Sequence, residues 1–213
     1  AICEISCIDS EFESLKKNSS NYEAGFDFEK TETGCKITAN GKAGHASTPW
    51  VGINAVSALI DLLYSVFDSR LGEFFTFLHK EVGMDYYGKD LGIDMSDEPS
   101  GPLTMNFGIL KADKNGGSAV FDIRYPDTKN ADDIISIIKS RTDKYDVDFI
   151  VDSVSKPLYL PKDSKTVSLL KGAYEDVTGN ECTVYSMGGG TYAREMHGKG
   201  VAFGPVFPET PDG

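Results

Sequence analysis

The stretch Gly34-Cys-Lys-Ile-Thr-Ala-Asn40 runs directly into Gly41-Lys-Ala-Gly-His-Ala-Ser-Thr-Pro49. Its first half places Cys35, Ile37 and Ala39 on one face of a predicted strand. After Pro49, apolar residues recur at helical spacing to about Phe67, and Ser47 and Thr48 are the candidates to cap that helix. His45 is therefore predicted to lie on a strand-to-helix connection near the positive end of a helix dipole. There it either bonds only its own turn or donates to a polarised carbonyl, and this stretch alone favours neither.

The composition of the chain limits the classes of function. The 213 residues carry a formal charge of 21 − 33 = −12, which argues against nucleic-acid and anionic-membrane partners. No apolar run is long enough to span a membrane, and the first residues lack a signal-peptide pattern. The four cysteines are scattered without a Cys-x-x-Cys pair, which indicates free thiols in a reducing cytoplasm more than a structural zinc site.

The order of predicted elements indicates an α+β fold. From Gly34 onward the order is strand, helix, strand, strand, helix, strand. The middle strands, 103–112 and 117–125, are joined by the hairpin signal Asp113-Lys-Asn-Gly-Gly117. This order fits a ferredoxin-like, split β-α-β sheet with helices on one face. The first 30 residues are predicted to extend it, so that residues 1 to about 155 form one continuous sheet ending in a strand over 145–154.

The character of the chain changes at Lys156-Pro-Leu-Tyr-Leu-Pro161, which places a domain boundary between residues 1–155 and 156–213. The second part is predicted to hold an amphipathic helix over 163–178, strands over 182–186 and 201–203, and a final loop over 204–213. These residues are too few to bury a core alone. We therefore expect them to be an α/β segment of a larger domain that is incomplete in this chain.

Three blocks together resemble one enzyme family. They are Gly44-His-Ala-Ser-Thr-Pro49, Phe121-Asp-Ile-Arg-Tyr-Pro126, and Gly188-Gly-Gly-Thr-Tyr-Ala-Arg194 followed by Val201-Ala-Phe-Gly-Pro205. The set resembles the co-catalytic zinc peptidases related to dipeptidase V, succinyl-diaminopimelate desuccinylase, carnosinase and carboxypeptidase G, and it is most similar to the dipeptidase V branch. The resemblance implies a lid domain over 1–155 and a returning segment of the catalytic domain over 156–213.

The resemblance also implies what this chain lacks. Enzymes of this family hold two zinc ions with histidines and carboxylates that lie outside the matching stretches. No metal ligand is therefore assigned within residues 1–213, and the chain is expected to be a fragment that binds no zinc and is inactive alone.

Two lid residues match the family's substrate site. His45 matches the histidine that polarises the scissile carbonyl, and Arg124 matches the arginine that binds the C-terminal carboxylate of the substrate. A guanidinium suits that task because its planar fork grips a carboxylate with two bonds. The alternative for Arg124 is a bridge to Asp122 or Asp127 at the end of a strand, and the residues alone favour that bridge.

The glycine-rich stretch of the second part matches a substrate-facing loop, with Gly188, Gly189, Gly190 and Arg194 as substrate-binding residues. Glycines allow backbone N–H groups to approach a ligand closely. The alternative is an ordinary turn with a solvated Arg194. Phosphate binding ranks last, because the Lys-Ser/Thr continuation of a phosphate loop is absent.

The function predicted from these patterns is that of a cytoplasmic, zinc-dependent dipeptidase acting on dipeptides with a free C-terminal carboxylate. The predicted partners are the dipeptide and a second copy bound through the lid. The alternative is a stand-alone lid-like binding or dimerisation module without catalysis, since an edge strand such as Ala1–Ile8 invites pairing.

Overall fold

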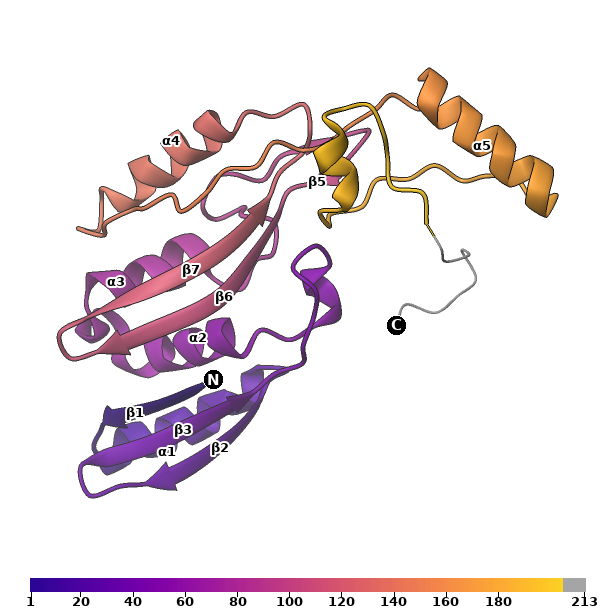
Figure 1. Cartoon of the computed structure of the whole chain (residues 1–213). Coiled ribbons are helices and arrows are strands. Elements are labelled where there is room, and N and C mark those ends of the chain that lie inside the picture. Colours follow the sequence, from indigo (N-terminus) through magenta and orange to yellow (C-terminus); the bar gives the residue numbers. More distant parts are fainter. Residues whose placement is uncertain (205–213) are drawn as a thin grey trace. The chain divides into compact units, whose positions relative to one another are not determined.

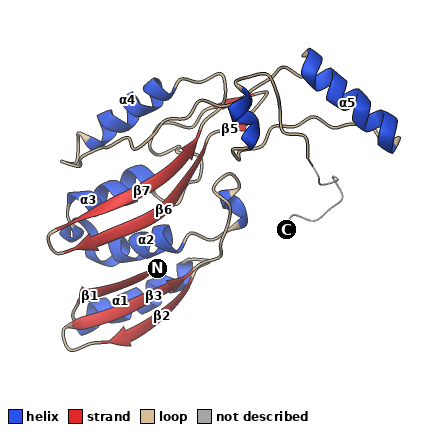
Figure 2. Ribbon diagram, viewed as in Figure 1, coloured by secondary structure: helices blue, strands red, loops and turns tan. Residues whose placement is uncertain are grey.

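The computed structural model describes residues 1–204, and its chain divides into two compact units, of which the first is Ala1–Val154 and the second begins at Ser155. Figure 1 gives the element labels, and Figure 2 shows that the first unit mixes helices with strands.

The first unit opens with a three-stranded antiparallel sheet in the order β1-β3-β2. Its strands are β1 (Ile2–Ser6), β2 (Gly25–Lys30) and β3 (Gly34–Asn40), and helix α1 (Asp9–Asn18) with the short turn η1 (Ser19–Asn21) connects the first two. The predicted alternation on β3 is confirmed, because Cys35, Ile37 and Ala39 are all buried. They pack with Leu15 of α1 and with one side of helix α2 (Ala55–Phe67).

A hairpin forms the second sheet of this unit, and the mixed α+β class is confirmed. Strands β6 (Thr104–Asp113) and β7 (Gly116–Arg124) pair antiparallel, with a bulge between Phe107 and Ile109. The remaining elements are η3 (Asp68–Leu71), α3 (Glu73–Phe77), the π-helical turn η4 (Leu78–Val82), the short pair β4 (Ser96–Asp97) and β5 (Gly101–Pro102), and α4 (Ala131–Thr142).

The prediction of one continuous sheet is wrong. Within residues 1–204 the strands form three separate sheets, and 145–154 forms no strand. Helix α2 explains the separation because it packs against both groups of strands (Figure 1). Ile60 belongs to the core under the hairpin, whereas Leu59 and Leu62 belong to the core of the first sheet. The two sheets therefore share a helix, and each buries its apolar face without needing the other's edge.

Helix α2 also begins later than predicted. Pro49–Val51 form a separate 3₁₀ turn, η2, and the side chain of Asn54 caps α2 by accepting from the N–H groups of Val56 (2.9 Å) and Ser57 (3.1 Å). The predicted caps Ser47 and Thr48 are wrong. The cause is that Ile53 pairs with Lys42 in an isolated β-bridge, which keeps the chain extended just before the cap.

The second unit holds α5 (Lys165–Thr178) and the 3₁₀ turn η5 (Tyr192–Met196). Ser164 caps α5, and Gly179 ends it in the left-handed conformation, with φ +71°. No strand occurs in the described part of this unit, so the predicted strands at 182–186 and 201–203 are wrong. The loop predicted beyond Gly204 and the Pro205 end of the third block lie outside the described residues. Within residues 155–204 few apolar side chains are buried, and the exposed fraction of Val177 reaches 85%.

Candidate functional site on the hairpin face

His45 lies in a loop between β3 and η2 and is exposed. The carbonyl of His45 accepts from the N–H of Thr48 at 2.9 Å, which closes a tight turn. Its ring is oriented by Ser47, whose backbone N–H donates to Nδ1 at 3.2 Å and whose hydroxyl oxygen lies 2.7 Å from the same nitrogen. Because Nδ1 accepts from an amide, the neutral ring carries its proton on Nε2. Nε2–H is therefore available as a donor on an exposed residue.

His45 lies on the connection between β3 and α2, as predicted, but its expected place near the positive end of the helix dipole is wrong. Helix α2 begins at Ala55, and the dipole effect is confined to the first turn of a helix. The donor capacity of His45 therefore comes from the tautomer that Ser47 selects.

A hydrogen bond attaches the His45 loop to the hairpin. The hydroxyl of Thr104, at the start of β6, donates to the carbonyl of Ala46 at 3.3 Å. In the register of the hairpin, Thr104 lies opposite Arg124 and Asn106 lies opposite Asp122. Thr104 and Asn106 alternate with the buried Met105 and Phe107 along β6, so they and their partners on β7 share the polar face of the hairpin. We call this set, with the His45 loop, the hairpin-face site.

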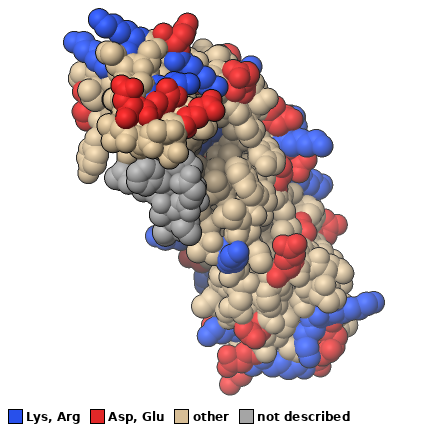
Figure 3. Space-filling view, turned by 90° about the vertical axis from the view of Figure 1, so that its right-hand side faces the viewer, with Lys and Arg blue, Asp and Glu red and all other residues tan. Residues whose placement is uncertain are grey.

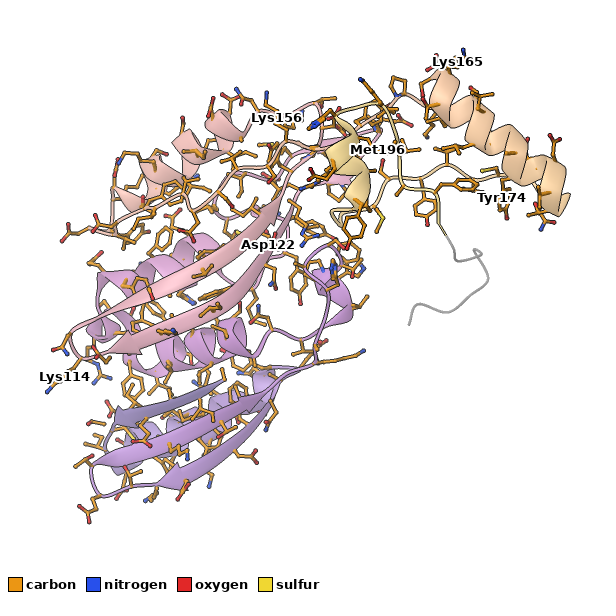
Figure 4. The ribbon with its side chains drawn as sticks, in the orientation of Figure 1. Lys114, Asp122, Lys156, Lys165, Tyr174 and Met196 are labelled. Carbon is orange, nitrogen blue, oxygen red and sulfur yellow. The ribbon has the colours of Figure 1, made fainter. Side chains whose placement is uncertain are left out.

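Arg124 is held in place by Asp122. The guanidinium donates from Nε to Oδ1 at 3.2 Å and from Nη2 to Oδ2 at 2.9 Å, in the two-bond geometry typical of arginine and carboxylate. This is one of the bridges that the sequence left open. It takes two of the five N–H donors of the guanidinium. Figure 4 labels Asp122 toward the open end of the hairpin, away from Lys114 at its turn.

The segment 96–102, which holds β4 and β5 and is called the β4–β5 excursion here, is hydrogen-bonded to the backbone that follows Arg124. The carboxylate of Asp97 accepts from the N–H (2.7 Å) and hydroxyl (2.6 Å) of Ser100, and from the N–H of Thr128 at 3.0 Å. The Ser100 hydroxyl oxygen accepts from the N–H of Asp127 at 2.9 Å. Burial alone would raise the pKa of Asp97, but these hydrogen bonds outweigh it and lower the pKa to about 2. Burial, followed by the nearby Asp97 charge, raises the pKa of Asp127.

A hollow of about 310 Å³ lies beside the His45 loop. Its walls come from residues 41–44 and 52–56, with Pro49, Tyr86 and residues 106–108. The backbone segments around Gly44 and Gly52 approach closely here, since a Cβ on Gly44 would lie 3.0 Å from the backbone nitrogen of Gly52. Next to this loop, the half-exposed rings of Trp50 and Tyr87 stack with centroids 6.2 Å apart. Neither aromatic residue was predicted from the sequence to lie near His45, although Trp50 is the only tryptophan of the chain.

The second unit carries the other predicted site residues. Gly188, Gly189 and Gly190 form a loop before η5, where the side chain of Thr191 accepts from the N–H of Ala193 at 3.3 Å. Arg194 lies against its own loop, because a Cβ on Gly190 would be 3.4 Å from the guanidinium carbon. The structure thus joins His45 and Arg124 within the first unit, and it places the glycine loop and Arg194 within the second.

No group of three or more His, Cys, Asp or Glu side chains within residues 1–204 lies close enough together to hold a metal ion. Nδ1 of His79 lies 2.6 Å from Oδ1 of Asp61, but these two residues form a pair and belong to no group of three. The described residues therefore do not fit a two-zinc centre.

No helix within the same residues is long and apolar enough to cross a bilayer. On the face drawn in Figure 3, Lys and Arg are interspersed with Asp and Glu and form no continuous basic patch among the described residues.

Comparison with known proteins decides the family. Residues 29–149, more than half of the chain, match the peptidase dimerisation domain of the M20 peptidases. The chain belongs to the M20 peptidase family. Its dimerisation domain has the ferredoxin-like lid fold, and β3, α2, the hairpin and α4 of the first unit fall within the matched residues.

Relatives of this M20 chain are much longer than it is. "Putative dipeptidase SH1171" of Staphylococcus haemolyticus is 32% identical over 178 residues, which cover 83% of this chain and 38% of that protein. "Putative dipeptidase YtjP" of Bacillus subtilis is 37% identical over 174 residues, which cover 81% of this chain and 37% of that protein. The chain thus spans little more than a third of the length of these relatives.

Proposed function

We propose that this chain is the substrate-binding part of a metal-dependent dipeptidase, with residues 1–155 as the lid and 156–213 as a segment of the catalytic domain. The family and the printed names of the relatives support a peptidase. The observation that carries the proposal is the hairpin-face site. There Thr104 bonds the loop that carries the exposed His45 and lies opposite the fixed Arg124.

Arg124 binds the C-terminal carboxylate of the dipeptide in this proposal. Asp122 holds the guanidinium plane in one orientation, so little side-chain entropy is lost when a substrate carboxylate binds. A fixed arginine also measures substrate length, because the scissile carbonyl must lie a set distance from the free carboxylate. We therefore propose dipeptides, rather than longer peptides, as the substrate class.

His45 stabilises the oxyanion that forms as the peptide carbonyl is attacked. Its Nε2–H donates to the carbonyl oxygen, and the bond strengthens as negative charge develops. Ser47 keeps the proton on Nε2 by occupying Nδ1, so no reorientation of the ring is required during the reaction.

Two zinc ions supply the activated water in enzymes of this family, and we propose that the ligands for them lie outside this chain. The residues of this chain bind and polarise the substrate in this division of roles, and they do not coordinate the metal. The chain alone is expected to leave Leu-Gly uncleaved and to retain no zinc after dialysis. Two tightly bound equivalents accompanied by turnover would refute this division of roles.

Gly188, Gly189, Gly190 and Arg194 are proposed as further substrate contacts from the second unit. A cytoplasmic location and a homodimer formed through the lid are proposed on the same basis, the latter supported by the match to a peptidase dimerisation domain. The alternative is a lid-like binding or dimerisation module that catalyses nothing. The intact mass of the natural gene product separates the two, because a product about twice the length of this chain is expected for an enzyme with its own metal ligands.

The role of His45 is tested in that natural gene product by His45→Ala. Removing an oxyanion donor typically lowers kcat about 10²- to 10³-fold. His197→Ala is the matched control, since this second histidine is also exposed but follows η5 of the other unit. An equal loss in both variants, or no loss for His45→Ala, would remove His45 from the mechanism.

A further inference from the structure

Two thiols meet across the first sheet. The Sγ atoms of Cys7 and Cys35 lie 3.6 Å apart, with the Cys7 thiol donating to Cys35. Cys35 lies on β3 opposite Ile5 of β1, and Cys7 follows β1 by one residue, with its N–H bonded to the carbonyl of Thr33 at 3.3 Å. Cys7 and Cys35 are therefore diagonal neighbours on one face of an antiparallel pair.

The residues around this pair do not form a metal site. Cys3 is a third thiol on the same strand face, but no group of three possible ligands among the described residues is arranged to hold a metal ion. All four cysteines of the chain are free thiols in the structure. Cys35 is completely buried, whereas Cys7 is half-buried and so reachable from solvent.

We propose that Cys7 and Cys35 are a reversible disulfide site, oxidised by low-molecular-weight disulfides. The thiolate of Cys7 attacks the disulfide RS–SR, which forms Cys7–S–SR and releases RS⁻. The sulfur of Cys35 then loses its proton and attacks the Cys7 sulfur, which forms the Cys7–Cys35 bond and releases a second RS⁻. Two electrons pass from the cysteines to RS–SR, and the two protons convert the released thiolates to RSH.

The order of these steps follows from burial. Burial, and then the hydrogen bond from Cys7, raises the pKa of Cys35 to about 12, so this thiol is a poor first nucleophile. Burial likewise raises the pKa of Cys3 to about 11. Cys7 therefore reacts first with the small disulfide, and Cys35 then resolves the mixed disulfide. The distance between the two Sγ atoms must shorten by only about 1.5 Å to reach that of an S–S bond.

The crosslink would fasten the edge of the sheet. The bond joins positions 28 residues apart and encloses α1 and β2 in one covalent loop. It fixes the end of β1 to β3 at the point where the chain turns into α1. The oxidised chain is therefore expected to unfold at higher temperature than the reduced chain, because the loop restricts the unfolded ensemble.

The test is oxidation of the 213-residue chain with glutathione disulfide, followed by intact mass and non-reducing peptide mapping. We expect a loss of about 2 Da, a Cys7–Cys35 crosslinked peptide, and reversal by dithiothreitol. Cys7→Ser should abolish the crosslink and the rise in Tm, and it should leave the fold intact because Cys7 is half-buried. Cys182→Ser is the matched control and should retain both.

The variant Cys3→Ser shows which of the two nearby thiols, Cys3 or Cys7, forms the bond to Cys35. If the crosslink persists in Cys3→Ser and disappears in Cys7→Ser, the assignment holds. A Cys3–Cys35 crosslink, or glutathione adducts on Cys7 without any intramolecular bond, would overturn it.

Discussion

Asp97→Asn tests whether the β4–β5 excursion holds the backbone that follows Arg124. In the wild type, Asp97 accepts three hydrogen bonds, from two groups of Ser100 and from the N–H of Thr128. An asparagine presents an NH₂ group on one side, so it faces one of these donors with another donor. The variant is expected to loosen the turn at Thr128 and to destabilise the first unit.

The pKa of Asp97 sets the size of this effect. It falls from 3.8 to about 2, and at 1.36 kcal/mol per unit the full linkage is about 2.4 kcal/mol. Asp97 lies near the surface, so solvent screening reduces the expected loss to about 1–2 kcal/mol at pH 7. Because the folded pKa is depressed, this stability is present above pH 3.8 and is lost as the pH falls toward 2.

The measurement is urea unfolding of wild type and Asp97→Asn from pH 7 to pH 2, with Glu98→Gln as the exposed, neighbouring control. The free-energy gap between wild type and Asp97→Asn should close below pH 3.8, and Glu98→Gln should follow the wild type. The pKa of Asp127 should also fall in Asp97→Asn, since the Asp97 charge contributes to raising it. If the difference in the free energy of unfolding stays constant across this pH range, the Asp97 carboxylate does not stabilise the backbone after Arg124.

Three further substitutions probe the frame of the site. Glu81→Ala should cost about 2–3 kcal/mol in urea unfolding, because it removes the buried acceptor of Arg141 and of the Tyr145 hydroxyl; a cost below about 1 kcal/mol would contradict this. Asn54→Ala should cost about 1–2 kcal/mol through the lost cap of α2, and far-UV circular dichroism should show reduced helix. Gly41→Ala should disturb the His45 loop, because its Cβ would overlap the carbonyl oxygen of Ile53, and unchanged amide shifts in that loop would argue otherwise.

Local patterns were enough to predict the strand before His45 and the hairpin. Alternation along β3 and the turn residues between β6 and β7 are short-range signals, and both elements form close to where they were expected. Strand pairing between distant segments depends on how α2 divides its apolar surface, which the helical period alone does not reveal. The separate sheets were therefore missed.

A register shift in the hairpin decides which residue lies opposite Arg124, and this shift was not predicted. Counting outward from the Asp113–Gly116 end of the hairpin would place Met105 opposite Arg124. The bulge between Phe107 and Ile109 moves the register by one residue, so that Thr104 lies there instead. This shift is what brings the polar face of the hairpin to the His45 loop. Gly108, which lies between Phe107 and Ile109, was the one signal for the bulge, because an isolated glycine inside a strand pattern suggests one.

The second unit could be predicted least. Its amphipathic helix, predicted over 163–178, forms as α5 over Lys165–Thr178. The two expected strands do not form in the described residues, because a strand requires a hydrogen-bonded neighbour and few apolar side chains are buried there. Pattern alone cannot supply the missing neighbour.

The measurement that bears most directly on the proposed function compares Leu-Gly with its C-terminal amide on the natural gene product and its Arg124→Lys variant. Lysine keeps the charge but loses the two-bond fork, so kcat/KM for Leu-Gly should fall on the order of 30- to 1,000-fold, equivalent to about 2–4 kcal/mol. The amide should be a poor substrate for the wild type and should lose little more in the variant. An equal penalty on both substrates would show that Arg124 has a structural role, such as its bond to Asp122, and would contradict its assignment to the substrate carboxylate.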